Sequence, residues 1–137
     1  MSAGYSGTSL PARLGVRAGQ RIAWLSAPRH FDALVGDLPG GVTVLRALRP
    51  PLDLLVQFAT VRRELERRLP KLRDAIFPDG VAWVAWPKRS SGVATDVTED
   101  LVRDLALAGG LVDVEVCAID ETWSGLKLVV PKDQPPG

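Results

Sequence analysis

The sequence has little cysteine, little histidine and no excess of charge of either sign. One cysteine cannot form an internal disulfide, and one cysteine with one histidine cannot supply the usual His/Cys cluster of a metal site. The 137 residues contain 17 Lys or Arg and 16 Asp or Glu, which gives a formal net charge of +1. Proteins that wrap a polyanion show a large basic excess instead. The composition therefore predicts no metal site and no nucleic-acid partner.

Long apolar runs are also missing. No run approaches the roughly 20 residues that span a bilayer, and the stretch from Met1 to Pro11 lacks the basic and apolar regions of a secretory signal. We therefore expect no membrane partner and a cytoplasmic protein. The length fits one domain over residues 1–137, with an N-terminal arm at 1–8 and a frayed tail at 132–137.

What the sequence does contain is an alternation of strand and helix patterns. This alternation is typical of an α/β domain in which helices cover a mostly parallel sheet. The last two strands are joined by a short turn, which predicts an antiparallel pair. Short apolar runs predict strands at residues 21–26, 42–45, 52–58, 81–86, 112–119 and 126–130.

Helices are predicted between most of these strands. The clearest one covers apolar positions from Val61 to Ile76, which recur every three or four residues, and Pro70 inside it predicts a kink. Asp96 and Glu99 resemble a capping box at the start of a further helix. Cys117 lies in an apolar strand and is expected in the core.

Three segments follow one another in the order of a known family. Residues 14–23 lead into a first strand, 51–56 form a strand with Asp53 near its start, and 72–84 contain a helix, a proline-glycine turn and a strand. Together they resemble class I, S-adenosylmethionine-dependent methyltransferases. The resemblance implies a single three-layer, Rossmann-like domain whose sheet has about six strands in the order 2-1-3-4-6-5, with strand 6 antiparallel.

The whole chain also resembles a family of short bacterial proteins of unknown function. That family implies no activity, cofactor or site residue for this chain. The segments that carry this likeness are 4–8, 86–88, 95–99 and 120–126.

Two departures from the methyltransferase pattern concern its cofactor. Such enzymes have a glycine-rich turn after the first strand, but the turn from Ser26 to His30 contains no glycine. They place an acid against the ribose hydroxyls after the second strand, where this chain has Arg46, which cannot accept hydrogen bonds. The chain also lacks one central helix–strand unit of the family. We therefore expect no S-adenosylmethionine, and we predict no other cofactor.

Ligands of open α/β sheets bind beyond the carboxyl ends of the strands. Lys88 would supply charge for a small anionic metabolite, and Phe58 with Trp86 would supply a stacking surface. His30 would be a base near neutral pH. The alternative interpretation puts Phe58 and Trp86 in the core and His30 on the surface. The rule places one crevice among Ser26, Pro28, Arg29, His30, Phe58, Trp86 and Lys88.

A polar turn around Trp123 is the second candidate site. One carboxylate of the pair Asp120 and Glu121 could act as an acid or base if it were desolvated, although adjacent turn residues more often face different ways. Because strands 4 and 6 are expected to be neighbours, we expect Lys88 to pair with Asp120 or Glu121 and Trp123 to close over this end. A structural role for the cluster is favoured over a ligand site.

Three classes of function fit these observations. The favoured class is a methyltransferase-like domain without methyltransferase activity that works through protein contacts, with a homodimer as one form. The alternative is a binder of a small anionic metabolite, or an enzyme, that uses the crevice. An active methyltransferase is the least favoured, since the sequence offers no recognisable set of nucleophile, base and orienting group.

Overall fold

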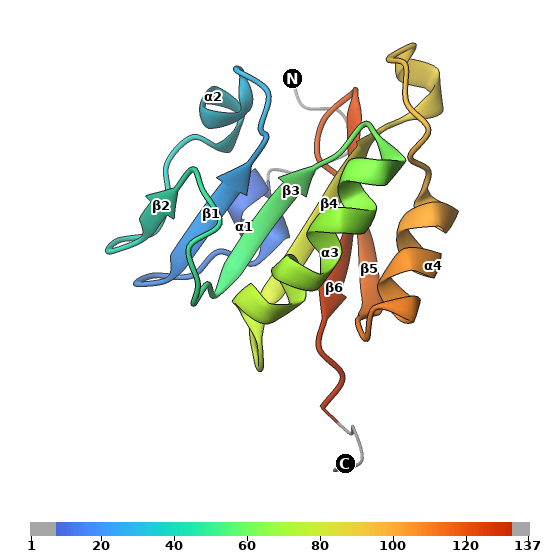
Figure 1. The fold of residues 1–137 in the computed structure, drawn as a ribbon. Coiled ribbons are helices and arrows are strands. Elements are labelled where there is room, and N and C mark those ends of the chain that lie inside the picture. Colours follow the sequence, from blue (N-terminus) through green and yellow to red (C-terminus); the bar gives the residue numbers. More distant parts are fainter. Residues whose placement is uncertain (1–7, 133–137) are drawn as a thin grey trace.

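The computed structural model describes residues 8–132, and the predicted alternation of strands and helices is present in it (Figure 1). The predicted arm and tail lie almost wholly outside the described residues. The strands are β1 (Arg21–Leu25), β2 (Thr43–Leu45), β3 (Leu54–Phe58), β4 (Val81–Pro87), β5 (Val112–Ala118) and β6 (Trp123–Val129). The helices are α1 (Leu10–Leu14), α2 (Phe31–Val35), α3 (Arg62–Ile76) and α4 (Glu99–Ala108), with a 3-10 turn η1 (Arg89–Ser91).

The six strands form one sheet in the order β2-β1-β3-β4-β6-β5. β1 pairs in parallel with β2 and β3, and β3 pairs in parallel with β4. β6 runs antiparallel to both β4 and β5. The predicted fold class, strand order and antiparallel closing pair are therefore confirmed. Within residues 8–132, no helix is long and apolar enough to cross a bilayer.

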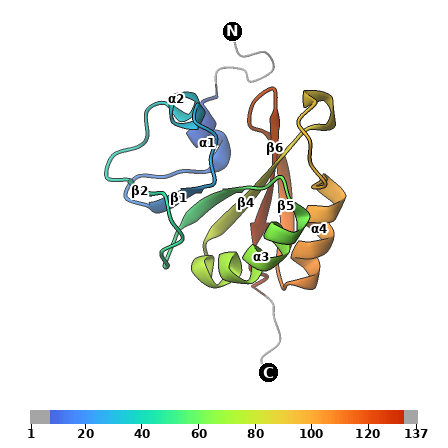
Figure 2. The same ribbon diagram turned by 45° about the horizontal axis from the view of Figure 1, so that its top comes forward.

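Helices cover both faces of the sheet, which gives three layers (Figures 1 and 2). Strand side chains alternate between these faces with a period of two. On β3, Leu55 packs with α3 and α4, whereas Val56 and Phe58 pack with α1 and α2. Gln57 is on the α3 face, where its side chain contacts Arg68. The face of each strand residue decides which helices it meets and, at the strand ends, which site it joins.

α3 forms because its apolar residues fall on one stripe, with Leu65, Leu69 and Leu72 buried against the sheet. Pro70 lies on the exposed side, and the helix continues past it to Ile76. Val61 is the N-cap residue and offers no capping side chain. The N-terminal N–H groups of α3 must therefore find acceptors elsewhere.

The acceptor at the start of α3 comes from a distant segment. Asp96 Oδ1 accepts a 2.7 Å hydrogen bond from the Arg62 N–H, and Thr95 Oγ1 donates to the carbonyl of Thr60 at 2.7 Å. The N-cap of α4 is Thr98, whose hydroxyl accepts from the Leu101 N–H. The predicted capping role of Asp96 for the following helix is therefore wrong, because Asp96 serves α3 instead.

β5 is an edge strand with an exposed outer surface. Val114 and Val116 are 54% and 49% exposed, and Cys117 is half-buried next to Arg13, which donates to the Ala118 carbonyl. The expectation that Cys117 belongs to the core is therefore confirmed only in part: its side chain packs against the core on the α1 and α2 face but stays half-buried. Burial raises the pKa of the Cys117 thiol, and the nearby Arg13 charge offsets this only in part.

Candidate functional site

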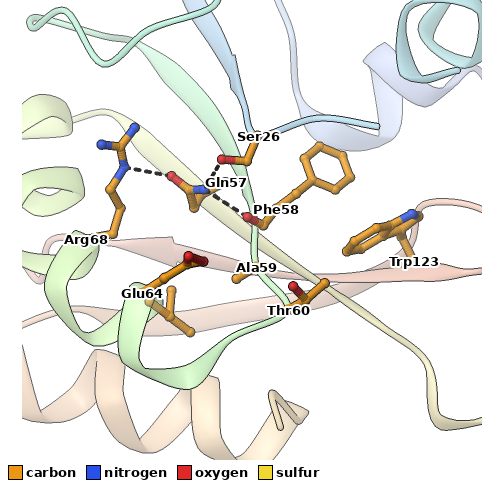
Figure 3. Close-up of a pocket in the computed structure, with 9 residues that line it drawn as sticks. Ser26, Gln57, Phe58, Ala59, Thr60, Glu64, Arg68 and Trp123 are labelled. Atoms are coloured by element: carbon orange, nitrogen blue, oxygen red, sulfur yellow. Dashed lines mark hydrogen bonds between the residues drawn. The ribbon is translucent and has the colours of Figure 1, made fainter. Parts of the chain in front are cut away.

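A polar pocket lies at the carboxyl ends of β1 and β3, beside the first two turns of α3 (Figure 3). Its volume is about 320 Å³, which is at the small end of the range of about 300–1,000 Å³ for ligand pockets. It joins residues that are far apart in the sequence. We call it the open pocket, and its lining is Ser26, Gln57, Phe58, Ala59, Thr60, Glu64, Leu65, Arg68 and Trp123.

Ser26 forms one wall of the open pocket and has an unusual backbone. It is the first residue after β1, and its φ of 56° places it in the left-handed region. Residues other than glycine rarely adopt this conformation, because Cβ approaches the following carbonyl oxygen. Such strain collects at functional sites, where the surrounding structure holds it in place. The turn after β1 thus keeps a glycine-like backbone although it contains no glycine.

Gln57 connects two walls of the open pocket. Its side chain is only 5% exposed, so its amide needs partners within the protein. Nε2 donates to the Phe58 carbonyl at 2.9 Å and, more weakly, to Ser26 Oγ at 3.4 Å. Oε1 accepts from Arg68 Nε at 3.0 Å (Figure 3). The amide therefore fixes Arg68 with respect to the strand ends.

The aromatic wall of the open pocket is part of a series of ring contacts that continues into the core. Phe58 and Trp123 meet edge to face with ring centroids 5.0 Å apart, and Phe58 meets Phe31 in the same way at 4.9 Å. Phe31 in turn contacts Trp24 at 5.0 Å. Such pairs stabilise the fold beyond their buried area. The rings that face the pocket are therefore anchored in the core between the sheet, α1 and α2.

A second polar group lies at the same end of the sheet, and its members bind one another. His30 Nε2 is 3.0 Å from Asp120 Oδ2. Lys88 Nζ donates to the backbone carbonyl of Asp120 at 2.8 Å. Asp120 Oδ1 accepts from the N–H groups of Thr122 and Trp123 at 2.8 and 2.7 Å. We call His30, Lys88 and Asp120 the closed cluster.

The environment of the closed cluster favours a charged Asp120. Burial by itself would raise the pKa of Asp120, but the N–H of Trp123, His30 and the N–H of Thr122 together lower it below the ordinary value. A carboxylate that accepts several N–H bonds is stabilised in its ionised form. Asp120 is therefore suited to holding the turn in place. It is poorly suited to accepting a proton from a ligand near neutral pH.

The structure divides the predicted site residues among several places. Ser26, Phe58 and Trp123 line the open pocket. Trp86 packs on the α3 and α4 face of the sheet, opposite to Phe58, and lines another pocket of about 330 Å³ near the start of α4. The prediction of one shared crevice is therefore wrong. The residues outside both pockets are Arg29, His30 and Glu121, which are exposed, and Pro28, Lys88 and Asp120.

The expected meeting of the two sequence segments did occur. Pro87 and Trp123 are paired across β4 and β6, and the Lys88 N–H donates to the Thr122 carbonyl at 2.7 Å. Lys88 binds the main-chain carbonyl of Asp120 rather than its carboxylate, because His30 and two N–H groups already occupy the carboxylate. Phe58 and Trp86 are both buried, as the alternative interpretation expected.

Six residues of the open pocket were not identified as site residues from the sequence: the apolar Ala59 and Leu65, and the polar Gln57, Thr60, Glu64 and Arg68. A signal existed for Gln57, which interrupts an otherwise apolar stretch close to the carboxyl end of its strand. Glu64 and Arg68 are four residues apart on the next helix, but a charged pair on a helix surface is too common to indicate a site.

Comparison with known proteins connects this fold to methyltransferases. No protein-family model matches the sequence, and no curated protein matches it. A methyltransferase dependent on S-adenosylmethionine (SAM) from Aquifex aeolicus has a TM-score of 0.63 at 14% identity, over 88% of this chain and 88% of that chain. The mitomycin 7-O-methyltransferase MmcR has a TM-score of 0.64 at 12% identity, over 82% of this chain and 49% of that chain.

An O-methyltransferase from neocarzinostatin biosynthesis, solved with S-adenosylmethionine, has a similar fold as well. Its TM-score is 0.61 at 14% identity, over 82% of this chain and 49% of that chain. This chain thus spans about half the length of the two O-methyltransferases. At these identities the likeness shows a methyltransferase-like, Rossmann-like fold. It does not bear on the activity of this chain.

The residues beyond β2 do not fit the ribose of S-adenosylmethionine. Arg46 follows the last residue of β2 and pairs with Asp32 of α2 at 2.9 Å. A guanidinium cannot accept hydrogen bonds from ribose hydroxyls, and the pairing with Arg46 engages the carboxylate of Asp32. Within residues 8–132, no group of three or more His, Cys, Asp or Glu side chains is arranged to hold a metal ion.

Proposed function

We propose that this methyltransferase-like domain binds a small anionic metabolite in the open pocket and does not catalyse methyl transfer. The observation that carries the proposal is the arrangement of Arg68, whose Nε is held by Gln57. No hydrogen bond or ion pair of its two Nη groups occurs within residues 8–132. A guanidinium with two free, parallel N–H groups is the usual partner of a carboxylate or phosphate.

The chemistry of the pocket supports binding rather than turnover. His30 is paired with Asp120 and does not line the open pocket. Among the described residues, no serine, threonine or cysteine makes a hydrogen bond to His30 that would activate a nucleophile. The described side chains can orient and neutralise an anion, which is the property of a binding site.

The proposal is tested with a panel of small carboxylates and phosphates in thermal-shift and calorimetric titrations. We expect at least one member to bind the wild type with a dissociation constant below about 1 mM and to bind Arg68→Gln at least tenfold more weakly. Arg67→Gln is the matched control, because Arg67 is an exposed neighbour on the same helix that does not line the pocket. Equal binding by the two variants, or no binding by the panel, would contradict the proposal.

The same titration tests the absence of methyltransferase activity. We expect S-adenosylmethionine to bind more weakly than about 10 μM, because Arg46 replaces the ribose acceptor. A tighter dissociation constant would contradict this expectation and favour an active methyltransferase instead.

Contact with another protein is the second candidate function, and strand β5 favours it. Val114 and Val116 expose apolar surface on an edge strand, and edge strands pair readily with other chains. A homodimer through this edge would be weakened by Val116→Lys. Sedimentation of the wild type and of Val116→Lys tests this. If both proteins sediment as monomers, the homodimer is contradicted.

A further inference from the structure

Glu64 and Arg68 lie four residues apart on α3, with the acid nearer the N-terminus. This is the favourable order for an ion pair on a helix. Two other pairs in the protein with the same spacing do form: Glu99–Arg103 at 2.7 Å and Arg62–Glu66 at 3.3 Å. Glu64 and Arg68 form no ion pair with each other or with any other residue that the structure describes.

The reason for the missing pair is the contact between Arg68 and Gln57. The buried amide of Gln57 holds Arg68 Nε at 3.0 Å, so the guanidinium is directed to the strand ends rather than along the helix to Glu64. Both residues nevertheless line the open pocket: Figure 3 shows the Glu64 carboxylate turned toward the other lining residues and the Arg68 guanidinium at the edge, beside Gln57. The pocket therefore presents one positive and one negative group that are separated from each other.

Separated opposite charges in one small pocket select a ligand that has both charges itself. A simple anion would satisfy Arg68 but would be repelled by the Glu64 carboxylate. A zwitterion would place its carboxylate on Arg68 and its ammonium group on Glu64. Both contacts would be charge-assisted hydrogen bonds, which are stronger than neutral ones.

The remaining lining indicates the rest of such a ligand. Ser26 and Thr60 contribute hydroxyl groups, whereas Phe58 and Trp123 form an aromatic wall. Aromatic rings of this kind accept an apolar or aromatic substituent in edge-to-face contact. A volume of about 320 Å³ leaves room for a ligand of amino-acid size.

We infer that the open pocket binds a zwitterion of the α-amino-acid class with an apolar or aromatic side chain. Arg68 binds the carboxylate, Glu64 binds the ammonium group, and Phe58 with Trp123 contacts the side chain. This inference rests on the proposed function, since it names the class of carboxylate-bearing ligand that the same pocket takes.

The test uses three probes that differ by one charged group: L-phenylalanine, 3-phenylpropanoate, which lacks the amine, and 2-phenylethylamine, which lacks the carboxylate. Binding is followed by the shifts of backbone amide signals during titration up to about 10 mM, a range that covers weak ligands. The variants are Glu64→Gln, Arg68→Gln and the matched control Glu66→Gln. Glu66 is an exposed acid on the same helix that does not line the pocket.

We expect phenylalanine to bind at least tenfold more tightly than either analogue, because each analogue loses one charge-assisted contact. Glu64→Gln should lower the affinity for phenylalanine about tenfold and leave the affinity for 3-phenylpropanoate unchanged or higher. Arg68→Gln should lower the affinity for phenylalanine to a similar extent. Glu66→Gln should leave all three affinities within about twofold.

The inference is overturned if either analogue binds as tightly as phenylalanine, if Glu64→Gln behaves like Glu66→Gln, or if none of the three probes binds. The proposed function survives each of these results, provided that another anion binds in a manner that depends on Arg68. If no anion binds in that manner, the proposed function fails as well, so the two failures are distinguishable.

Discussion

The open pocket and the closed cluster lie at the same end of one sheet, but they differ in whether their polar groups have partners within the protein. In the closed cluster, Asp120 has partners on both carboxylate oxygens, and its main-chain carbonyl binds Lys88. In the open pocket, Arg68 uses Nε for Gln57 and keeps its Nη groups for other partners, and Glu64 has no partner among the described residues.

This difference indicates separate roles for the two regions: the closed cluster contributes to the stability of the fold, and the open pocket to ligand binding. A group whose hydrogen bonds are all made within the protein contributes to the folded state, and its removal leaves other groups unpaired. A charged group that stays unpaired in a pocket contributes little to folding and remains available to a ligand. We therefore expect substitutions in the closed cluster to change stability, and substitutions of Glu64 or Arg68 to change binding.

Trp123 belongs to both regions and should give the largest effect. Its main-chain N–H donates to Asp120 Oδ1. Its ring packs against Phe58 and lines the open pocket. Trp123→Ala should lower the free energy of unfolding by about 3 kcal/mol, the lower end of the range for buried aromatic residues, because the ring is only partly buried. Urea unfolding measures the loss, with Trp123→Phe as the control that keeps an aromatic ring.

A loss below about 1 kcal/mol for Trp123→Ala would show that the ring serves the pocket alone. The proposal that Trp123 contributes to stability as well as to the pocket would then be wrong.

The pH dependence of stability should give a smaller effect that belongs to the closed cluster. The pKa of Asp120 is lowered in the folded protein, so ionised Asp120 stabilises the fold at pH values above its unfolded pKa of about 3.9. This contribution is lost as the pH falls through the lower, folded-state pKa. Asp120→Asn keeps the acceptor oxygen but not the charge, and should cost about 1 kcal/mol at pH 6.

Urea unfolding of the wild type and Asp120→Asn from pH 6 to pH 3 measures this difference. The gap in free energy of unfolding should stay constant down to about pH 4 and narrow below it, as the pH falls toward the folded-state pKa. A gap that stays constant over the whole range would mean that Asp120 acts only through its neutral hydrogen bonds. Glu64→Gln serves as the control, since Glu64 has no partner within residues 8–132.

Ser26→Gly should give the smallest effect and tests the strain in the open pocket. Glycine relieves a left-handed conformation that costs other residues about 1–2 kcal/mol, but it also makes the unfolded chain more flexible, at a cost of about 0.5–1 kcal/mol. The net change in stability should be a gain of at most about 1 kcal/mol. Ser26→Val is the contrasting variant and should be clearly destabilised, because β-branched residues avoid positive φ.

The sequence predicted the sheet well because the strands follow from local patterns and their order follows from a resemblance. Apolar runs, helix stripes and the short turn before β6 are all local, and the resemblance to methyltransferases supplied the order. The placement of Phe58 and Trp86 failed for a different reason. Phe58 is in register with Ala85, so Trp86 points to the opposite face, and a shift of one residue decides the face.

The open pocket could be predicted only in part for a similar reason. Ser26 and Phe58 follow from the rule that ligands bind at strand ends, and Trp123 follows from the expectation that the turn before β6 closes over this end. The role of Arg68 requires knowing that Gln57 faces α3 and draws the guanidinium away from Glu64. That contact depends on the packing of a helix on a sheet, and the spacing of the residues in the sequence does not reveal it.

The tether between the start of α3 and the segment before α4 has a consequence for the order in which the protein assembles. Asp96 binds the Arg62 N–H, and Thr95 binds the Thr60 carbonyl, so the rim of the open pocket depends on residues some 34 and 35 positions later in the chain. Trp123 supplies the aromatic wall later still. During synthesis from the N-terminus, β1, β3 and α3 emerge without this support. The pocket is therefore completed last, and a chain shortened before β6 would retain its charged residues without the site they form.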